Sequence, residues 1–145
     1  MTVHLLKLCV GCDSVKDLAD WQVEQLKRER KPVELCHRTL QMPKRRHEIL
    51  DGGSLYWVIK GFVLVRQRII DLRPDTKDDG TPCCGIVYDR ELITTRAQPR
   101  RAFQGWRYLE AADAPNDVRP YEDEAGDMPP PGMREELREL RLIDW

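Results

Sequence analysis

The chain has 145 residues, of which 41% are hydrophobic and 34% are charged, with a formal net charge of -1. This length allows one hydrophobic core and is too short for two ordinary domains. The longest uncharged apolar run, Leu55–Ile59, is far shorter than the roughly 20 residues that a membrane span needs. The N-terminus also has no basic region followed by an apolar core. We therefore expect a cytoplasmic protein with no membrane association.

Charge is distributed unevenly along the chain. Residues 1–109 hold 20 Lys and Arg against 14 Asp and Glu, a net charge of +6, whereas residues 110–145 hold 4 against 11, a net charge of -7. A basic body followed by an acidic region is consistent with an anionic partner for the body, with a protein partner for the acidic region, or with simple solubility.

Cysteine usage does not favour a disulfide-bonded secreted scaffold. The five cysteines are an odd number, and Cys83 and Cys84 are adjacent. A disulfide framework is not expected from this pattern, so reduced thiols are the default.

The N-terminal part reads as a strand followed by a helix. Thr2–Leu8 is apolar and compatible with a strand. Ser14 and Asp17 have capping-box spacing, and apolar residues then recur at helical intervals up to about Arg30, before Pro32. The pattern predicts an amphipathic helix over this segment.

The middle of the chain contains the strongest strand signal. Residues 33–42 are compatible with a strand, and residues 44–50 with a short helical turn that ends in an Asp-Gly-Gly turn. The run Tyr56–Arg73 is rich in β-branched and aromatic residues and is too long for one ordinary strand. With Gly61 as the bend, it predicts two strands at about 55–60 and 62–72.

The following segment alternates between turns and short strands. Residues 74–82 read as a polar loop with an Asp-Gly turn, and residues 85–88 and 92–95 as a further strand or hairpin. Residues 96–109 mix four arginines with three aromatic residues, which fits a loop that leads into a short strand.

We expect an α+β fold with a small, mostly antiparallel, barrel-like sheet, preceded by the strand-helix unit. Residues 1–113 would form this single domain. Residues 114–132 are acidic and rich in proline, which predicts an extended linker, and residues 133–145 predict a helix that docks on the domain.

The best functional lead is a set of arginines and aromatic residues in the middle region. Arg66 and Arg68 lie two apart on one strand, so their side chains share a face about 6.6 Å apart. Further arginines lie close in sequence to aromatic rings, which is the combination that single-stranded nucleic acid needs for phosphate contact and base stacking. The alternative is that the rings fill the core and the arginines pair with carboxylates. The candidate binding residues are Arg66, Arg68, Arg100, Arg101, Phe103, Trp106 and Arg107.

Cys9 and Cys12 form a second candidate site. They lie between a predicted strand and a predicted helix start, where helix amides can lower the pKa of a thiol, so a redox pair is one interpretation. With Cys36 and His37 they offer four zinc ligands, although neighbouring strand residues point to opposite faces. Buried, unreactive cysteines are the third interpretation, and we assign neither a metal nor a cofactor.

Three segments resemble an uncharacterised family of short alphaproteobacterial proteins, the DUF1489 family. They are LLKLCVGCDSV near the start, LYWVIKGFVLVRQRIIDL in the middle, and FQGWRYL followed by Asp113-Ala114-Pro115. The resemblance spans nearly the whole chain and implies no activity. More weakly, the helical turn, Asp51-Gly52-Gly53 and the successive strands resemble the PUA and ASCH group of small β-barrels. That resemblance implies binding of RNA or a modified nucleotide.

The sequence carries no catalytic signature, so a non-enzymatic role is favoured. The leading hypothesis is a bacterial nucleic-acid-binding module, with RNA as the expected ligand. A thiol redox enzyme that uses Cys9 and Cys12 is the alternative, and a protein-interaction domain that uses the acidic C-terminal region is another.

Overall fold

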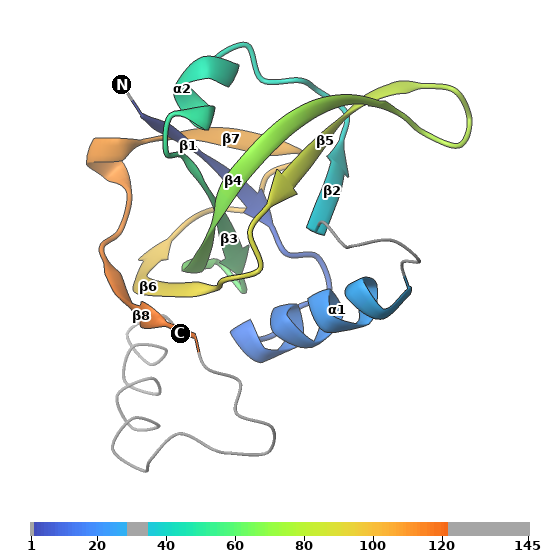
Figure 1. Cartoon of the computed structure of the whole chain (residues 1–145). Coiled ribbons are helices and arrows are strands. Elements are labelled where there is room, and N and C mark those ends of the chain that lie inside the picture. Colours follow the sequence, from blue (N-terminus) through green and yellow to red (C-terminus); the bar gives the residue numbers. More distant parts are fainter. Residues whose placement is uncertain (1, 29–34, 122–145) are drawn as a thin grey trace.

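The computed structural model describes residues 2–28 and 35–121. It has mixed α+β architecture, with an eight-stranded sheet and few helices (Figure 1). The predicted C-terminal helix at 133–145 and most of the predicted linker lie outside the described residues.

The chain order begins with strand β1 (Val3–Leu8) and helix α1 (Val15–Arg28). The backbone N–H of Asp17 donates to the Ser14 hydroxyl at 3.2 Å, as the capping-box spacing predicted. The remaining elements are β2 (Leu35–Thr39), α2 (Arg46–Leu50), β3 (Ser54–Ile59), β4 (Phe62–Thr76), β5 (Pro82–Tyr88), β6 (Ile93–Pro99), β7 (Trp106–Glu110), the 3-10 helix η1 (Ala111–Asp113) and β8 (Asp117–Pro120).

The sheet follows the order β2-β5-β4-β3-β1-β7, and β6 branches from β4 to pair with β8. This path does not close into a barrel. β1 and β3 run parallel, whereas the other paired strands are antiparallel. The prediction of a mostly antiparallel sheet is therefore confirmed.

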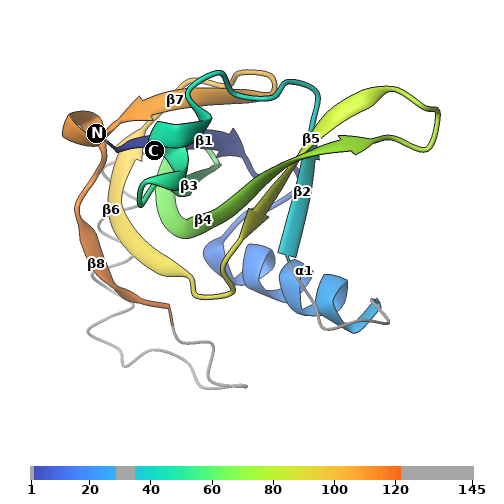
Figure 2. The same ribbon diagram turned by 45° about the horizontal axis from the view of Figure 1, so that its top comes forward.

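Strand β4 organises the sheet because it pairs with three strands. Its first part pairs with β3 and β6, and from Ile69 onward it pairs with β5. The expected bend between the two predicted strands is a tight turn, with φ of 50° at Lys60 and 85° at Gly61. β4 is longer than predicted and runs through Pro74 to Thr76, so the expected loop at 74–82 is shorter. It continues with β5 as a hairpin arm that leaves the body of the molecule (Figures 1 and 2).

The two faces of the sheet bury different clusters. The larger core lies on the face of Leu5, Leu55, Trp57 and Val65, where Leu18 of α1 packs. The smaller cluster lies on the opposite face and contains Leu6, Tyr56, Val58, Val63 and Leu109. Alternation along β1 thus supplies both faces.

A buried amide pair fixes α1 to the sheet. The side chains of Gln22 and Gln67 exchange two hydrogen bonds of 2.7 and 2.8 Å, and Trp57 Nε1 also donates to Gln67 Oε1 at 2.9 Å. Gln67 Nε2 further donates to the carbonyl of Asp89 at 2.9 Å. Because buried amides are costly without partners, this network specifies how the helix docks.

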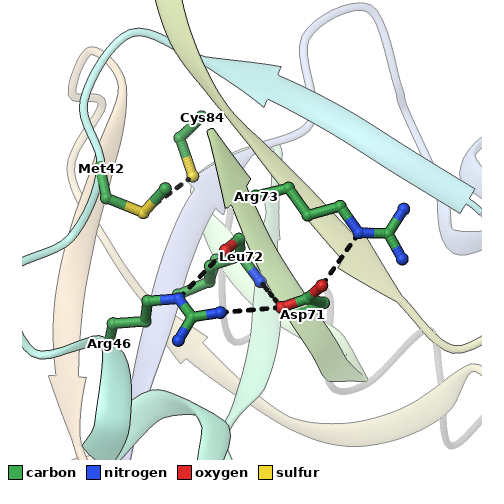
Figure 3. Close-up of polar contacts among 6 residues, drawn as sticks. All are labelled: Met42, Arg46, Asp71, Leu72, Arg73 and Cys84. Carbon is green, nitrogen blue, oxygen red and sulfur yellow. Dashed lines mark hydrogen bonds and ion pairs between the residues drawn. The ribbon is translucent and has the colours of Figure 1, made fainter. Parts of the chain in front are cut away.

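Arg46 also holds α2 against β4, where Arg73 binds the same carboxylate (Figure 3). Arg46 donates to the Leu72 carbonyl and to Asp71 Oδ1, both at 3.1 Å. Arg73 donates to Asp71 Oδ2 at 2.9 Å. These cations are therefore compensated and serve the fold.

Among residues 2–28 and 35–121, no helix is long and apolar enough to cross a membrane.

Candidate nucleic-acid interface

An open groove of about 390 Å³ lies where β1, β2, β7 and the β4–β5 hairpin meet. Its charged lining residues are all cationic, and it also has two large apolar side chains. We call it the basic groove; the lining residues on which its chemistry depends are Lys7, Arg38, Leu40, Lys77, Trp106 and Arg107.

Strand pairing brings the first two of these side chains together. Lys7 of β1 is the direct antiparallel partner of Trp106 of β7. Directly opposite residues have neighbouring side chains on one face. Lys7 Nζ donates to the Gly105 carbonyl at 3.2 Å, which holds the ammonium group beside the start of β7.

A hydrogen bond and a ring contact orient the indole of Trp106. Its Nε1 donates to the Gln41 carbonyl at 2.8 Å, and its ring makes an edge contact with Tyr108 at a centroid distance of 4.8 Å. The ring is half-buried, so it is neither sealed in the core nor freely mobile. Leu40, which also lines the groove, is 63% exposed. These side chains give the groove an apolar surface on which a flat ring could lie.

Arg107 also borders the groove, with its side chain on the face of the smaller cluster, opposite the ring of Trp106. Its guanidinium donates to the carbonyls of Gln104 and Trp106 at 2.8 and 2.9 Å, and it lies 5.3 Å from the centroid of Phe103. Phe103 packs against the smaller cluster beneath it. Carbonyls and a ring orient this cation without neutralising it, so its charge is available to an anion.

The hairpin side of the groove is more balanced in charge. Arg38 Nε binds Asp75 Oδ2 at 2.9 Å, and Arg38 NH1 lies 3.9 Å from Asp78 Oδ1. Lys77, at the hairpin turn, has no ion pair among the described residues. Lys7, Lys77 and Arg107 therefore carry the positive charge of the groove that no ion pair neutralises, and the charge of Lys77 also acts on Asp79.

The charge of Lys7 also acts on a half-buried histidine, His37. Burial, the larger cause, and the positive charge of Lys7 together lower the pKa of His37 to about 4. Burial also lowers the pKa of the Lys7 ammonium group from its ordinary value. His37 is accordingly neutral near pH 7, and its ring makes an edge contact with that of Trp57 at a centroid distance of 5.8 Å.

The seven candidate residues divide into separate groups. Trp106 and Arg107 line the groove, and Phe103 supports Arg107. Arg66 lies in a different hollow, where it binds Asp117, and Arg68 is exposed further along β4. The structure thus does not bring Arg66 and Arg68 to the ring of Trp106.

Arg100 and Arg101 lie on the loop between β6 and β7. The backbone N–H of Arg100 donates to the Gly61 carbonyl at 2.8 Å, and its side chain donates to Gln98 at 2.8 Å. Arg101 is exposed. Neither side chain lines the basic groove.

Sequence reasoning missed Lys7, Arg38 and Lys77, which are far from Trp106 along the chain. The available signal was a cation inside an otherwise apolar strand, which holds for Lys7. Arg38 and Lys77 reach the groove through the pairing of β2, β4 and β5, and no local pattern reveals that pairing.

The cysteines differ from the expected reduced state, because Cys9 and Cys12 form a disulfide. The disulfide lies in the turn between β1 and α1, with Val10 89% exposed and Gly11 at a φ of 83°. Within residues 2–28 and 35–121, no group of three or more His, Cys, Asp or Glu side chains is arranged to hold a metal ion.

The fold defines the class as an open-sheeted α+β protein with a basic groove at one end of β1. Residues 5–143 match the family described as a protein of unknown function, DUF1489. Because the match covers nearly the whole chain, this protein belongs to the DUF1489 family. No curated protein and no solved structure matches it.

Proposed function

We propose that this protein binds nucleic acid without catalysing a reaction, and that it does so in the basic groove. The observation that carries the proposal is that Lys7, Lys77, Trp106 and Arg107 gather around one hollow. In this scheme the three cations contact phosphates and the indole stacks on a base.

The charge pattern supports a single strand more than a duplex. A single-stranded ligand presents unstacked bases, which a half-buried indole can hold while neighbouring cations contact the backbone. The groove is a local hollow of about 390 Å³, so it fits about one nucleotide of such a chain at its centre. The exposed Leu40 side chain adds apolar contact at the rim.

RNA in the cytoplasm is the ligand that we propose. The resemblance to the PUA and ASCH barrels supports this choice, and a PUA-like ancestry of the sheet is part of the same proposal. Side-by-side titration with RNA and DNA strands of one sequence tests this choice directly, since only contacts to the 2′-hydroxyl distinguish them.

The experiment measures binding of labelled single-stranded RNA by fluorescence anisotropy over a series of salt concentrations. The test variant carries Lys77→Gln and Arg107→Gln. The control carries Arg96→Gln and Arg119→Gln, which remove two exposed arginines from β6 and β8, outside the groove. Both variants have the same net charge, so a difference between them reports position.

We expect the groove variant to bind about tenfold or more weakly, and its salt dependence to lose about 1.4 units of slope for two lost phosphate contacts. The control should stay within about twofold of the wild type, because a remote charge acts only through the screened overall field. Trp106→Leu should cost about 1–3 kcal/mol of binding without changing the slope. Equal behaviour of the two double variants would refute the groove as the binding site.

A second candidate function is thiol redox chemistry, and the Cys9–Cys12 disulfide favours it. The polar groups around the disulfide argue against this function. The amide of Asp17 is bonded by Ser14, and the Asp17 carboxylate accepts from the amide of Asp13 at 2.8 Å. These caps and carboxylates leave little positive field to stabilise a thiolate.

Alkylation of the reduced protein at graded pH tests this candidate. A cysteine of this pair that reacts well below the ordinary thiol pKa of about 8.5 supports redox chemistry. Thiols that react only near that pH make the disulfide a structural link. Cys9→Ser serves as the control that identifies which sulfur reacts.

A further inference from the structure

A second hollow, of about 280 Å³, lies away from the basic groove, beside the chain that leads into β8. Figure 2 shows β8 running alongside β6 on the opposite side of the molecule from the hairpin arm. We call this second hollow the Arg66 hollow. The lining residues on which its chemistry depends are His4, Ser54, Tyr56, Arg66, Asn116 and Asp117. Its size is near the lower end of small-molecule sites.

Arg66 is held in the geometry that recognises an oxyanion. Its Nε and NH2 groups donate to the two carboxylate oxygens of Asp117 at 2.7 and 2.6 Å, and NH1 donates to the Ser54 hydroxyl at 2.9 Å. A guanidinium presents this pair of parallel donors to carboxylate and to phosphate alike. The Arg66 side chain is 21% exposed, so its surroundings fix its position.

A neutral donor lies beside this arginine. His4 Nδ1 accepts a hydrogen bond from the backbone N–H of Ser54 at 2.9 Å, so the ring proton resides on Nε2. The ring of His4 makes an edge contact with that of Tyr56, with the two ring centroids 5.0 Å apart. Burial lowers the pKa of His4, and the Arg66 charge adds to that effect, so near pH 7 the imidazole donates without adding charge.

The carboxylate that fills this position can leave it. The Asp117 side chain is 44% exposed, and rotation about its own bonds carries it into solvent. Strand β8 need not move, because its backbone is held independently: Asp117 pairs with Thr95, and the Asn116 carbonyl accepts from Arg96 N–H at 2.9 Å. A ligand therefore competes with one side chain and not with the fold.

We propose that the Arg66 hollow is a binding site for a small molecule that carries a phosphate or carboxylate group, and that Asp117 occupies the position of that group when no ligand is bound. This inference is independent of the proposed nucleic-acid function. When Asp117 turns away, Arg66 contributes one positive charge beside the neutral His4. The site then suits a singly charged oxyanion, with Ser54, Tyr56 and His4 as hydrogen-bonding partners.

The test is a titration with inorganic phosphate and, separately, with acetate, at constant ionic strength. Binding is followed through the amide resonances of residues around the hollow in ¹H–¹⁵N spectra. Asp117→Asn removes the competing charge at nearly constant shape, and Arg66→Gln removes the receptor. Asp71→Asn is the matched control, because Asp71 compensates Arg46 and Arg73 in the same way and lines neither the basic groove nor the Arg66 hollow (Figure 3).

Competition with Asp117 sets the expected size of the effect. If the internal ion pair is formed about 90% of the time or more, its removal raises the apparent affinity about tenfold or more. Asp117→Asn should show this gain, Arg66→Gln should bind neither anion, and Asp71→Asn should match the wild type. A stronger gain for phosphate assigns a phosphorylated ligand, and a stronger gain for acetate assigns a carboxylate.

Two results would overturn the proposal. One is an Asp117→Asn variant that gains no affinity for either anion, and the other is an equal gain in Asp71→Asn, which would mean that any uncompensated arginine suffices. RNA binding measured on the same proteins separates the two ideas. Arg66 lies outside the basic groove, so loss of anion binding with RNA binding intact affects this proposal alone.

Discussion

The basic groove and the Arg66 hollow each hold an exposed or half-buried cation whose charge lowers the pKa of a nearby histidine, yet their charge balance differs. In the groove, Lys7 and Arg107 are oriented by carbonyl oxygens. In the hollow, Arg66 is neutralised by a carboxylate of the same chain. The pKa shifts of the two nearby histidines reflect this difference in charge balance. The pKa of His37 falls to about 4, with Lys7 adding to burial, whereas for His4 the charge of Asp117 opposes that of Arg66. A cation marks an open anion site only when its neighbours leave it uncompensated.

The largest expected loss of stability comes from Gly53→Ala. This residue directly precedes Ser54, whose hydroxyl accepts a hydrogen bond from Arg66 in the Arg66 hollow. A Cβ atom at Gly53 would lie 2.3 Å from the Ile49 carbonyl oxygen and 2.4 Å from that of Val3. Because both atoms belong to the backbone, we expect a loss of about 3 kcal/mol in the free energy of unfolding, measured by urea denaturation. Gly80→Ala is the control, since its Cβ meets nothing within 4 Å and its φ of 87° should cost only about 1 kcal/mol. Equal losses would contradict this explanation.

The next effect sharpens the contrast between the two histidines. The folded-state pKa of His37 is about 4, below the ordinary 6.5, so the unfolded chain binds more protons between these values. Stability should therefore fall by about 2–3 kcal/mol as the pH drops from about 6.5 to about 4. The difference between wild type and His37→Gln at the two pH values isolates this contribution, because the acidic groups are common to both proteins.

His4→Gln supplies the matched comparison for that measurement. The Asp117 charge partly offsets the Arg66 charge at His4. We therefore expect a smaller pH-dependent difference from this substitution than from His37→Gln. A larger one would mean that Asp117 does not compensate Arg66 in solution.

A third test separates cations that serve the fold from cations that serve binding. Arg66→Met leaves the Asp117 carboxylate and the buried Ser54 hydroxyl without their donor, so we expect a loss of about 1–2 kcal/mol in stability. Arg107→Met removes an exposed cation and should change stability by less than about 0.5 kcal/mol. Thermal denaturation of both proteins checks the contrast. The reverse order would assign the structural role to Arg107.

The smallest effect concerns Arg100 and Arg101, which the sequence placed among the phosphate contacts. Neither side chain lines the groove. Their joint replacement by glutamate should weaken RNA binding by less than the loss of Lys77 and Arg107, through the overall field alone. Anisotropy titrations at one salt concentration compare the two. A larger loss from the glutamate variant would extend the interface to the β6–β7 loop.

Local patterns predicted the elements better than their assembly. The capping spacing of Ser14 and Asp17, the turn at Gly61 and the strands around it were all readable, because each depends on neighbours in sequence. The extension of β4 through Pro74 was not, since its pairing with β5 compensates for a proline that ends strands elsewhere.

The candidate site shows the same limit more strongly. Trp106 and Arg107 were found because aromatic residues and arginines are adjacent in the chain. Lys7 joins them only through the pairing of β1 with β7. The capture of Arg66 by Asp117, 51 residues later, is likewise a tertiary contact without a local signal.

The length of β4 has a consequence for how the molecule comes apart. One continuous strand hydrogen-bonds to β3, β5 and β6. We therefore expect that the parts of the sheet beside the two hollows do not unfold independently of each other. Heating or denaturant should accordingly unfold residues 2–28 and 35–121 in a single cooperative step. The slowest amide protons to exchange with deuterium should be those between Val63 and Ile69, at the junction that every route of unfolding has to break.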